Sequence, residues 1–513
     1  MADVGVAQEV ISPARCLWLA NGLPSSFLSR LTLSGHPNSA AAINSSFKLG
    51  NVAQTAIGLA GLSAALFHKL RTGVDQEVTV DARHAVLEFQ SEAWYTVDDS
   101  LPGGLWESIA GLYKTKDEGF VRIHTNFPHH RKGILSILNV PDTPETSRAA
   151  VQSALRSWDA VDFESQAAAN GMCATAMRSF AEWRLHPHAK ALEGVPPVQI
   201  IKICDAPKME VIAGGQGNGK IKRPLDGIRV LDLSRVLAGP VAGRTLAAHG
   251  ADVLLVTSPR LPSLPNLDVD TSRGKRTTQL DLTLPADHQK LTELASAADV
   301  FLQAYRPGGL EAKGFGPQEL AALRPGRGIV VANLTAWGWQ GPWKDRRGFD
   351  SLVQTATGFN VAEAEAYAKF SGDSQQGELQ PRPLPMQALD HAAGYLLAFG
   401  INAALCKTIT EGGSWEVRVS LAAVGQWIRS LGQLTPREAF SAPARPFPSR
   451  GLPLDPEIAA LSLPWTSKNE REGGRKIKIT ALQHAAVLSR TPVREGEESQ
   501  APMVLDAHAA EWL

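Results

Sequence analysis

Cysteine is scarce in this sequence of 513 residues, which contains four cysteines and no C-x-x-C pair. Widely spaced cysteines (Cys16, Cys173, Cys204 and Cys406) build neither a disulfide framework nor a zinc knuckle, and they are typical of a reducing compartment. The N-terminal segment lacks the basic and then apolar pattern of a secretory signal. We therefore expect an intracellular protein in the cytoplasm, with a mitochondrial location left open.

The sequence also lacks an excess of charge of either sign, because 51 Lys and Arg balance 51 Asp and Glu. A nucleic-acid-binding domain would normally carry a basic face. No long apolar run is present either: residues 56–67 and 392–406, the longest such stretches, are shorter than the ~20 residues needed to cross a bilayer. Hydrophobic residues nevertheless make up 44% of the chain, which is enough to build cores. These features predict a globular protein with no nucleic-acid partner and no membrane span.

Two segments of the chain resemble each other. Residues 53–80 and 392–419 align without a gap at a constant offset of 339 positions, with nine identities. Each segment reads as an apolar helix of small residues, a turn with glycine, and an alternating E-V-x-V strand. This pattern predicts a partial internal duplication, although two alanine-rich helices can also match by chance.

Apolar runs of strand length alternate with helical patterns in the second half. Runs of this kind are found at 228–233, 253–256, 299–304 and 328–333. A helical pattern at 241–249 separates the first two. Such alternation predicts βαβ units and a doubly wound parallel sheet, the α/β fold class.

Composition divides the rest of the chain. Residues 108–205 alternate short strands, such as 119–124, with amphipathic helices, such as 147–158 and 175–185, and we predict a smaller α+β domain there. The expected organisation is a first-copy helix and strand segment at 1–107, the small domain at 108–205, a glycine-rich linker at 206–224, the α/β domain at 225–435, and an irregular segment with closing strands, one at 476–480, at 436–513.

Two motifs that suggest a ligand are better explained as loops. The segment 214–220 (G-G-Q-G-N-G-K) matches part of a phosphate loop, but Ile221 replaces the required Ser or Thr and Pro224 interrupts a following helix. The pairs at 129–130 and at 186 and 188 are histidines without a Cys or acidic partner at ligand spacing. We therefore predict a linker and no metal site.

Two other segments offer groups suited to phosphate. The turn at 234–240 leads from a predicted strand into a helix, where helix N-terminal amides are presented to ligands. It lacks the G-x-G-x-x-G pattern, which argues against a dinucleotide. Arg273 and Arg276 carry guanidinium groups that bind phosphate well. With Lys275 they form a basic triplet, and a triplet of this kind is more often part of a solvated turn.

Asp390 stands at the start of an apolar helix of small residues. One interpretation is structural, because Asp is a favoured helix N-cap. The other is chemical: a helix N-terminus stabilises an ionised carboxylate, and in a site closed to water that carboxylate can attack an acyl group. Spacing alone favours the cap.

Several segments, taken in order, resemble the class III CoA-transferases of the CaiB/BaiF family. The first is L-D-G-I-R-V-L-D-L-S-R-V-L-A-G-P at 225–240, followed by H-G-A-D-V at 249–253. The series continues with R-G-K-R at 273–276, Y-R-P-G at 305–308 and G-F-D at 348–350, and it ends with L-D-H-A-A-G at 389–394. The longer, duplicated fungal members are the most similar.

The resemblance implies a Rossmann-like CoA-binding domain at 225–435 and assigns site residues within it. Asp390 lies where the family has its nucleophile. The other candidates are expected to contact CoA: Val236, Leu237 and Ala238 at the nucleotide end, Arg273 and Arg276 at the phosphates, and Tyr305 and Arg306 along the pantetheine.

The N-terminal part resembles a later portion of the same family. Residues 49–89 resemble the helix, turn and strand that follow the nucleophile, and residues 108–205 resemble the family's smaller domain. Asn51 lies opposite Asp390 at the constant offset, and a carboxamide is a poor nucleophile, so we expect the first copy to be inactive. The small domain would then serve the sheet of the second part, within one chain or across an expected homodimer.

By this resemblance, Asp390 attacks an acyl-CoA to form an anhydride and then a thioester, from which a carboxylic acid takes the CoA. The expected substrates are therefore an acyl-CoA and a carboxylic acid, with coenzyme A as substrate and no tightly bound cofactor. Two alternatives stay open. An α-methylacyl-CoA racemase would need a histidine where Phe349 stands. A non-catalytic CoA-binding protein is consistent with Asn51 and the single small domain.

Overall fold

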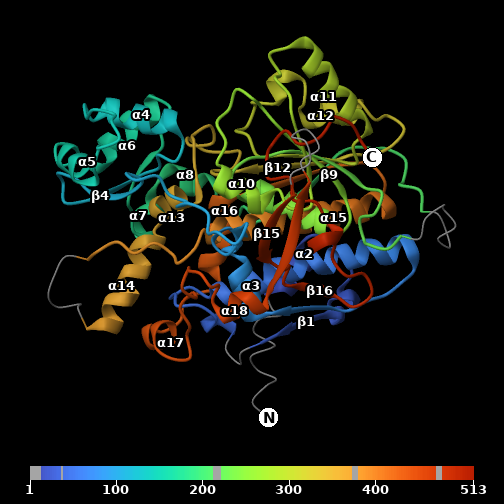
Figure 1. Cartoon of the computed structure of the whole chain (residues 1–513), viewed down its shortest axis with the longest axis horizontal. Coiled ribbons are helices and arrows are strands. Elements are labelled where there is room, and N and C mark those ends of the chain that lie inside the picture. The colour runs from blue at the N-terminus through green and yellow to red at the C-terminus, as the bar shows by residue number, and fades with distance from the viewer. Residues whose placement is uncertain (1–12, 36–38, 212–220, 373–378, 469–475) are drawn as a thin grey trace.

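The computed structural model describes residues 13–35, 39–211, 221–372, 379–468 and 476–513 (Figure 1). The phosphate-loop match at 214–220 lies outside the described residues.

The largest sheet has seven strands in the order β10-β9-β8-β11-β12-β13-β7. Six are parallel, and β7 pairs antiparallel with β13 at one edge. The bounds are β7 Gln199–Cys204, β8 Arg229–Leu233, β9 Asp252–Thr257, β10 Arg276–Gln279, β11 Val300–Gln303, β12 Val330–Thr335 and β13 Ser414–Ser420. Counted from β8, the parallel order is 3-2-1-4-5-6, which reverses next to β8, and α/β proteins bind ligands at such a reversal.

Helices cover both faces of this sheet. Successive side chains of a strand point to opposite faces, so neighbouring residues of β8 contact different helices. Val230 belongs to a buried cluster that includes Val241 of α9 (Ala238–Ala248) and Leu396 of α15 (Ala388–Thr410). Leu231 belongs to a second cluster, with Leu291 of α11 (Pro285–Ala297) and Leu320 of α12 (Pro317–Ala322). The predicted α/β class is confirmed.

Two long apolar helices, α2 (Leu49–Thr72) and α15, pack against each other in the core (Figure 1). The Asn402 side chain of α15 donates a hydrogen bond to the Ala60 carbonyl of α2 at 3.2 Å. Both helices are long and apolar enough to cross a membrane, and both exceed the apolar stretches expected from the sequence. Their most apolar windows are 100% and 89% buried within the protein, as in core helices of a globular fold.

The two predicted repeat segments have the same local structure. Each long helix is followed by a strand, β2 (Val78–Asp81) or β13, and then by a second helix, α3 (Ala82–Glu88) or α16 (Leu421–Ser430). The caps of these second helices, Asp81 and Ser420, are separated by the offset found in the sequence. Helix, strand and cap therefore occur at equivalent positions in both segments.

The small domain contains an antiparallel sheet and three helices on one side of the molecule (Figure 1). Its elements are β4 Gly111–Lys114, β5 Phe120–Ile123, β6 Ala174–Ala176, α4 Pro128–Ile137, α5 Arg148–Leu155 and α6 Ala160–Ala169. The helix expected at 175–185 is wrong at its start: Thr175 lies in β6, and α7 (Phe180–Leu185) begins only after the Ser179 capping box. After α8 (Pro187–Ala191), β7 already belongs to the large sheet.

The C-terminal segment is more regular than expected. It contains α17 (Pro436–Phe440), α18 (Pro456–Ala460) and β14 (Ser462–Lys468), which pairs with β15 (Lys476–Leu482). β15 in turn pairs with β3 (Thr96–Val97), and β16 (Ala486–Leu488) adds to the sheet of β1 (Leu31–Ser34) and β2. The last strands therefore complete sheets that the N-terminal segment begins.

The remaining helices connect these parts. They are α10 Pro265–Thr271, α13 Asp350–Thr357 and α14 Phe359–Ser371, with short 3₁₀ turns at Ser25–Arg30, Ser39–Ala41, Ser91–Ala93, Glu311–Lys313 and Gly496–Glu498.

Candidate functional site

A cavity of roughly 500 Å³ lies where the N-terminus of α15, the turn between β8 and α9, and the small domain meet. Its walls come from both halves of the sequence. The lining residues that matter below are Glu92, Trp106, Arg122, His124, Val236, Leu237, Phe349 and Asp390. One chain therefore supplies both the α15 wall and the small-domain wall.

Asp390 is the third residue of α15, and its side chain faces this cavity with only 8% exposure. It does not cap the helix. Asp350 does so, because its Oδ2 accepts hydrogen bonds from the backbone amides of Leu389 at 2.7 Å and Asp390 at 2.9 Å. Within the described part of the chain, no group donates a hydrogen bond to the Asp390 carboxylate. The interpretation of Asp390 as an end cap is therefore wrong.

The surroundings of Asp390 disfavour its charge. Burial, followed by the nearby Asp350 and Glu92 carboxylates, raises the pKa of Asp390 well above its usual range. Burial also raises the pKa of Asp350 to about 6. A carboxylate that is neither hydrated nor hydrogen-bonded is a better nucleophile than one in water.

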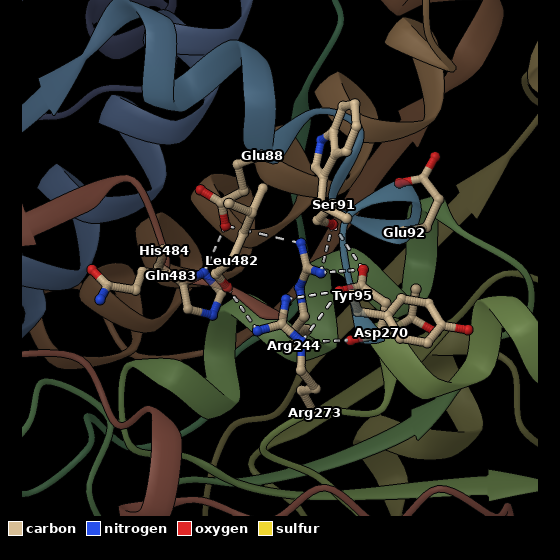
Figure 2. Close-up of polar contacts among 12 residues, drawn as sticks. Glu88, Ser91, Glu92, Tyr95, Arg244, Asp270, Arg273, Leu482, Gln483 and His484 are labelled. Atoms are coloured by element: carbon tan, nitrogen blue, oxygen red, sulfur yellow. Dashed lines mark hydrogen bonds and ion pairs between the residues drawn. The ribbon is translucent and has the colours of Figure 1, made fainter. Parts of the chain in front are cut away.

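Glu92 enters the cavity from the first half of the chain and accepts a hydrogen bond from Nε2 of His391 at 3.0 Å. The residue before Glu92, Ser91, belongs to a buried ionic network (Figure 2). Arg244 of α9 contacts Asp270 at 2.5 Å and the Ser91 hydroxyl at 2.8 Å.

The C-terminal segment also enters this network. Arg273 contacts Asp270 at 2.7 Å and donates to the Leu482 carbonyl at 2.9 Å, and His484 contacts Glu88 at 2.8 Å (Figure 2). The network therefore joins the N-terminal segment, the α/β domain and the C-terminal strands behind the cavity.

The turn between β8 and α9 lies beside Asp390, whereas the family resemblance implies a place for it at the nucleotide end of CoA. Val236 and Leu237 line the cavity, and Ala238 is the first residue of α9. Val236 has a φ of 73°, a costly conformation for a β-branched residue that is found mainly at functional sites. The lack of a side chain at Gly394 allows α15 to pack closely against α9, because a Cβ there would lie 2.6 Å from the Ala238 carbonyl.

The two predicted phosphate-binding arginines have partners within the protein. Arg273 is held by Asp270 in the network above. Arg276, which is 5% exposed, pairs with Asp252 at 2.9 Å and donates to the Glu511 carbonyl at 2.7 Å. Neither side chain lines the cavity, so this part of the site prediction is corrected: both guanidinium groups stabilise the fold.

Tyr305 lines a second hollow of roughly 340 Å³ at the ends of β8 and β9, together with Arg260 and Lys313. A narrow third hollow shares Ser258 and Leu261 with it and shares Val236 and Leu264 with the Asp390 cavity. The three hollows are therefore neighbours along the carboxyl edge of the sheet, with the middle one being small. Arg306 is exposed and lines none of the three.

The small domain contributes polar residues that the sequence analysis missed. Arg122 and His124 follow each other on one face of β5 and its extension, and both line the cavity. His124 stacks on Phe349, with ring centroids 3.8 Å apart, and burial lowers its pKa to about 3, so its imidazole is neutral. The alternation of polar residues along the predicted strand at 119–124 was the available signal.

Comparison with known proteins agrees with this architecture. The model of CoA-transferase family III matches residues 27–205 and 225–445. The chain is 30% identical to the acetyl-coenzyme A transferase nodX of Hypoxylon pulicicidum over 336 residues, which cover 63% of this chain and 55% of that protein. It is 28% identical to an acyl-CoA transferase of Gibberella moniliformis over 398 residues, 72% of this chain and 68% of that protein.

A crystal structure of a hypothetical protein from Mycobacterium tuberculosis has 33% identity and a TM-score of 0.34, and the match covers 41% of this chain and 57% of that one. The chain thus spans little more than half of the Hypoxylon and Mycobacterium proteins. The family model itself matches well over half of this chain, in two blocks separated by the linker. This chain therefore belongs to CoA-transferase family III.

Proposed function

We propose that this protein transfers CoA from an acyl-CoA to a carboxylic acid through covalent intermediates on Asp390. The observation that carries the proposal is the buried carboxylate of Asp390, which faces a cavity and receives no hydrogen bond from the described residues. Family membership and the names of the fungal relatives support the same activity. Because the Hypoxylon relative is named for acetyl-CoA, acetyl-CoA is the first donor to test.

The three neighbouring hollows suggest where the parts of an extended thioester lie. Arg260 and Lys313 at the outer hollow offer cations for phosphates, and Tyr305 offers an aromatic surface for a base. The middle hollow, between Leu261 and Val236, has a volume of only roughly 20 Å³, so a pantetheine arm there requires the side chains around it to move apart. We therefore propose that CoA binds with its nucleotide near Tyr305 and its sulfur at Asp390.

The chemistry then runs in balanced steps. A carboxylate oxygen of Asp390 attacks the thioester carbon, the C–S bond breaks, and CoA leaves as a thiolate. The thiolate attacks the aspartyl carbonyl of the anhydride, which releases the first acid and forms an aspartyl-CoA thioester. The acceptor carboxylate then attacks the aspartyl-CoA thioester, which expels the thiolate and forms a second anhydride. The thiolate attacks the acceptor's carbonyl in this anhydride, which forms the new acyl-CoA and releases the carboxylate of Asp390. Backbone amides at the start of α9 are suited to stabilise the oxyanions.

One observation favours a second candidate function. Phe349 cannot accept a proton, but the neutral imidazole of His124 stacks on it and lines the same cavity. An imidazole there would permit proton exchange at the α-carbon of an acyl-CoA, as in a racemase, only if bound substrate raises its pKa from about 3 toward neutrality. Deuterium incorporation at the α-carbon without CoA transfer would favour that function.

Replacement of Asp390 tests the proposal. We expect Asp390→Asn to lower the rate of CoA transfer by on the order of 10⁴-fold or more, as expected for the loss of a covalent nucleophile. Hydroxylamine added during turnover should convert residue 390 of the wild-type protein to a hydroxamate, which peptide mass spectrometry detects.

Asp287→Asn is the matched control, because this carboxylate also lies at a helix N-terminus but outside the cavity. Transfer that persists in Asp390→Asn, or a hydroxamate at another residue, contradicts the proposal. Association into a homodimer stays a prediction, which light scattering of the purified protein checks.

A further inference from the structure

Glu92 shares the cavity with Asp390, although it comes from the first half of the chain. Its side chain is 5% exposed, and its Oε2 accepts the hydrogen bond from Nε2 of His391. Ser91, the preceding residue, donates to Asp270 at 2.7 Å and so fixes the backbone next to Glu92 (Figure 2). Oε1 of Glu92 accepts no hydrogen bond from the described residues. One carboxylate oxygen is therefore held in place, and the other is left for a ligand in the cavity.

Transfer of CoA between acids has no use for this second carboxylate. An acid acceptor reaches the cavity already ionised, so it attacks without losing a proton and requires no base. The charge of Glu92 even opposes transfer, because it disfavours the ionised form of Asp390 and repels an incoming anion. A buried charge is also costly to maintain. These costs argue for a task that uses Glu92, and a base serves an acceptor that must lose a proton.

The other titratable groups of the cavity are poorly suited to act as that base. The titratable side chains that line it are Glu92, Glu107, Arg122, His124 and Asp390. Asp390 is itself the nucleophile, and Arg122 stays protonated at neutral pH because burial lowers its pKa only to about 10. Glu107 is engaged by Arg131. Burial lowers the pKa of His124 to about 3, which makes its imidazole a weak base. Glu92 is the group that remains.

We propose that the protein also hydrolyses acyl-CoA, with Glu92 as the general base that activates water. This inference rests on the proposed function, because the water attacks the anhydride formed on Asp390. The cavity of roughly 500 Å³ has room for water beside a short acyl group, since a water molecule takes up about 30 Å³ in the liquid. Hydrolysis is expected when no acid occupies the cavity.

The hydrolytic step balances without a further reactant. After CoA has left as a thiolate, a water molecule attacks the acyl carbon of the anhydride while its proton passes to Glu92. The bond between that carbon and the Asp390 oxygen breaks, and its electron pair restores the Asp390 carboxylate. The acid departs with one oxygen from water. Glu92 then gives its proton to the CoA thiolate, which leaves as free CoA.

Replacement of Glu92 tests the inference. Release of free CoA from acetyl-CoA in a buffer without carboxylates measures hydrolysis, and transfer to propionate measures the first activity. We expect Glu92→Gln to lower the rate of hydrolysis about 100-fold, within the range for loss of a general base, and to lower the ratio of hydrolysis to transfer at least about tenfold. Glu293→Gln, which removes an exposed glutamate of α11, is the control and should leave both rates unchanged.

Glu92→Asp keeps a carboxylate but withdraws it by one methylene group. It should lower the same ratio less than Glu92→Gln does, and it serves as the test if Glu92→Gln does not fold, which thermal unfolding checks. Water labelled with ¹⁸O locates the attack in a single turnover. We expect the label in the released acetate, whereas label in the side chain of residue 390 would contradict attack at the acyl carbon.

Two sets of results separate this inference from the proposed function. Transfer without hydrolysis above the rate in the absence of enzyme, or a ratio of hydrolysis to transfer that Glu92→Gln leaves unchanged, would overturn the inference alone. Hydrolysis that both Glu92→Gln and Asp390→Asn abolish, in a protein that transfers CoA to no acid, would support the inference and contradict the proposed function.

Discussion

Asp350 and Asp390 form a pair of buried carboxylates with different tasks. Asp350 accepts two backbone amides at the start of α15 and so fixes the position of Asp390, whereas Asp390 receives no such hydrogen bond from the described residues. A negative charge on one carboxyl group disfavours ionisation of the other, so the two groups titrate as a coupled pair. Asp350 is therefore a positioning residue whose charge, second to burial, raises the pKa of Asp390.

Replacement of Asp350 should shift the pH dependence of the reaction. Attack requires ionised Asp390, so activity should fall as pH decreases through its raised pKa. Asp350→Asn removes a negative charge beside Asp390, which lowers that pKa, and the acid limb of kcat/KM should move to lower pH. A pH profile of kcat/KM measures the shift.

The same profile for Asp287→Asn should overlay the wild type, because this carboxylate accepts a backbone amide outside the cavity. An acid limb that stays in place in Asp350→Asn would show that Asp350 does not influence the ionisation that limits activity. Lower activity with an unshifted limb would assign Asp350 a purely structural role.

Single residues differ in how far the sequence predicted them. Spacing alone favoured a cap at Asp390, and only the family resemblance marked Asp390, Val236 and Leu237 as site residues, which line one cavity. Arg273 and Arg276 were expected at phosphates but form buried ion pairs, since residue type does not reveal the partner. Arg122 was missed because its cavity is assembled from segments far apart in the chain.

At the scale of elements, α9 and α15 touch at Gly394, which has no room for a side chain. A Cβ at this position would lie 2.6 Å from the Ala238 carbonyl and 2.8 Å from the Val241 side chain. This contact sets the distance between the turn that carries Val236 and the helix that carries Asp390. Helix packing and site geometry therefore depend on one position.

Gly394→Ala should destabilise the protein and impair the site together. We expect a loss of about 1–3 kcal/mol in the free energy of unfolding, as for other overpacked cores. We also expect kcat to fall, because α9 must move away from α15. Urea denaturation and steady-state kinetics measure the two effects.

Gly326→Ala is the control for this prediction, since nothing lies within 4 Å of a Cβ there. A stable and fully active Gly394→Ala variant would show that the helices adjust without disturbing the cavity.

Elements with a strong pattern were predicted well, and those without one were not. Strands β8, β9, β11 and β12 follow apolar runs, because both faces of a parallel sheet are buried. β14 was missed since its sequence, S-L-P-W-T-S-K, contains a proline and polar residues, and its pairing with β15 is what makes it a strand.

At the scale of the whole molecule, the network around Arg244 ties together parts that are distant in sequence (Figure 2). Burial opposes the charge of Asp270, but Arg244 and Arg273 outweigh it and lower its pKa to about 2. Because this value is below the usual 3.8, the stabilisation is complete above about pH 4 and is lost between about pH 4 and pH 2.

Arg244→Met should therefore destabilise the entire protein. We expect a loss of roughly 3 kcal/mol in the free energy of unfolding at pH 7, since one partner of a buried ion pair is removed. Urea denaturation measures the loss. Arg156→Met, in an exposed ion pair, should change stability by less than about 0.5 kcal/mol. Equal stability of the two variants would contradict the importance of the network.

The packing of α2 against α15 has a consequence for synthesis. The two helices are separated by 339 positions, so at about 5–20 residues per second α2 leaves the ribosome roughly 20–70 s before its partner. During that interval the apolar surface of α2 cannot yet pack against α15. Such an exposed apolar surface is prone to aggregation, so shortening the delay between the two helices by faster codons should raise the soluble yield.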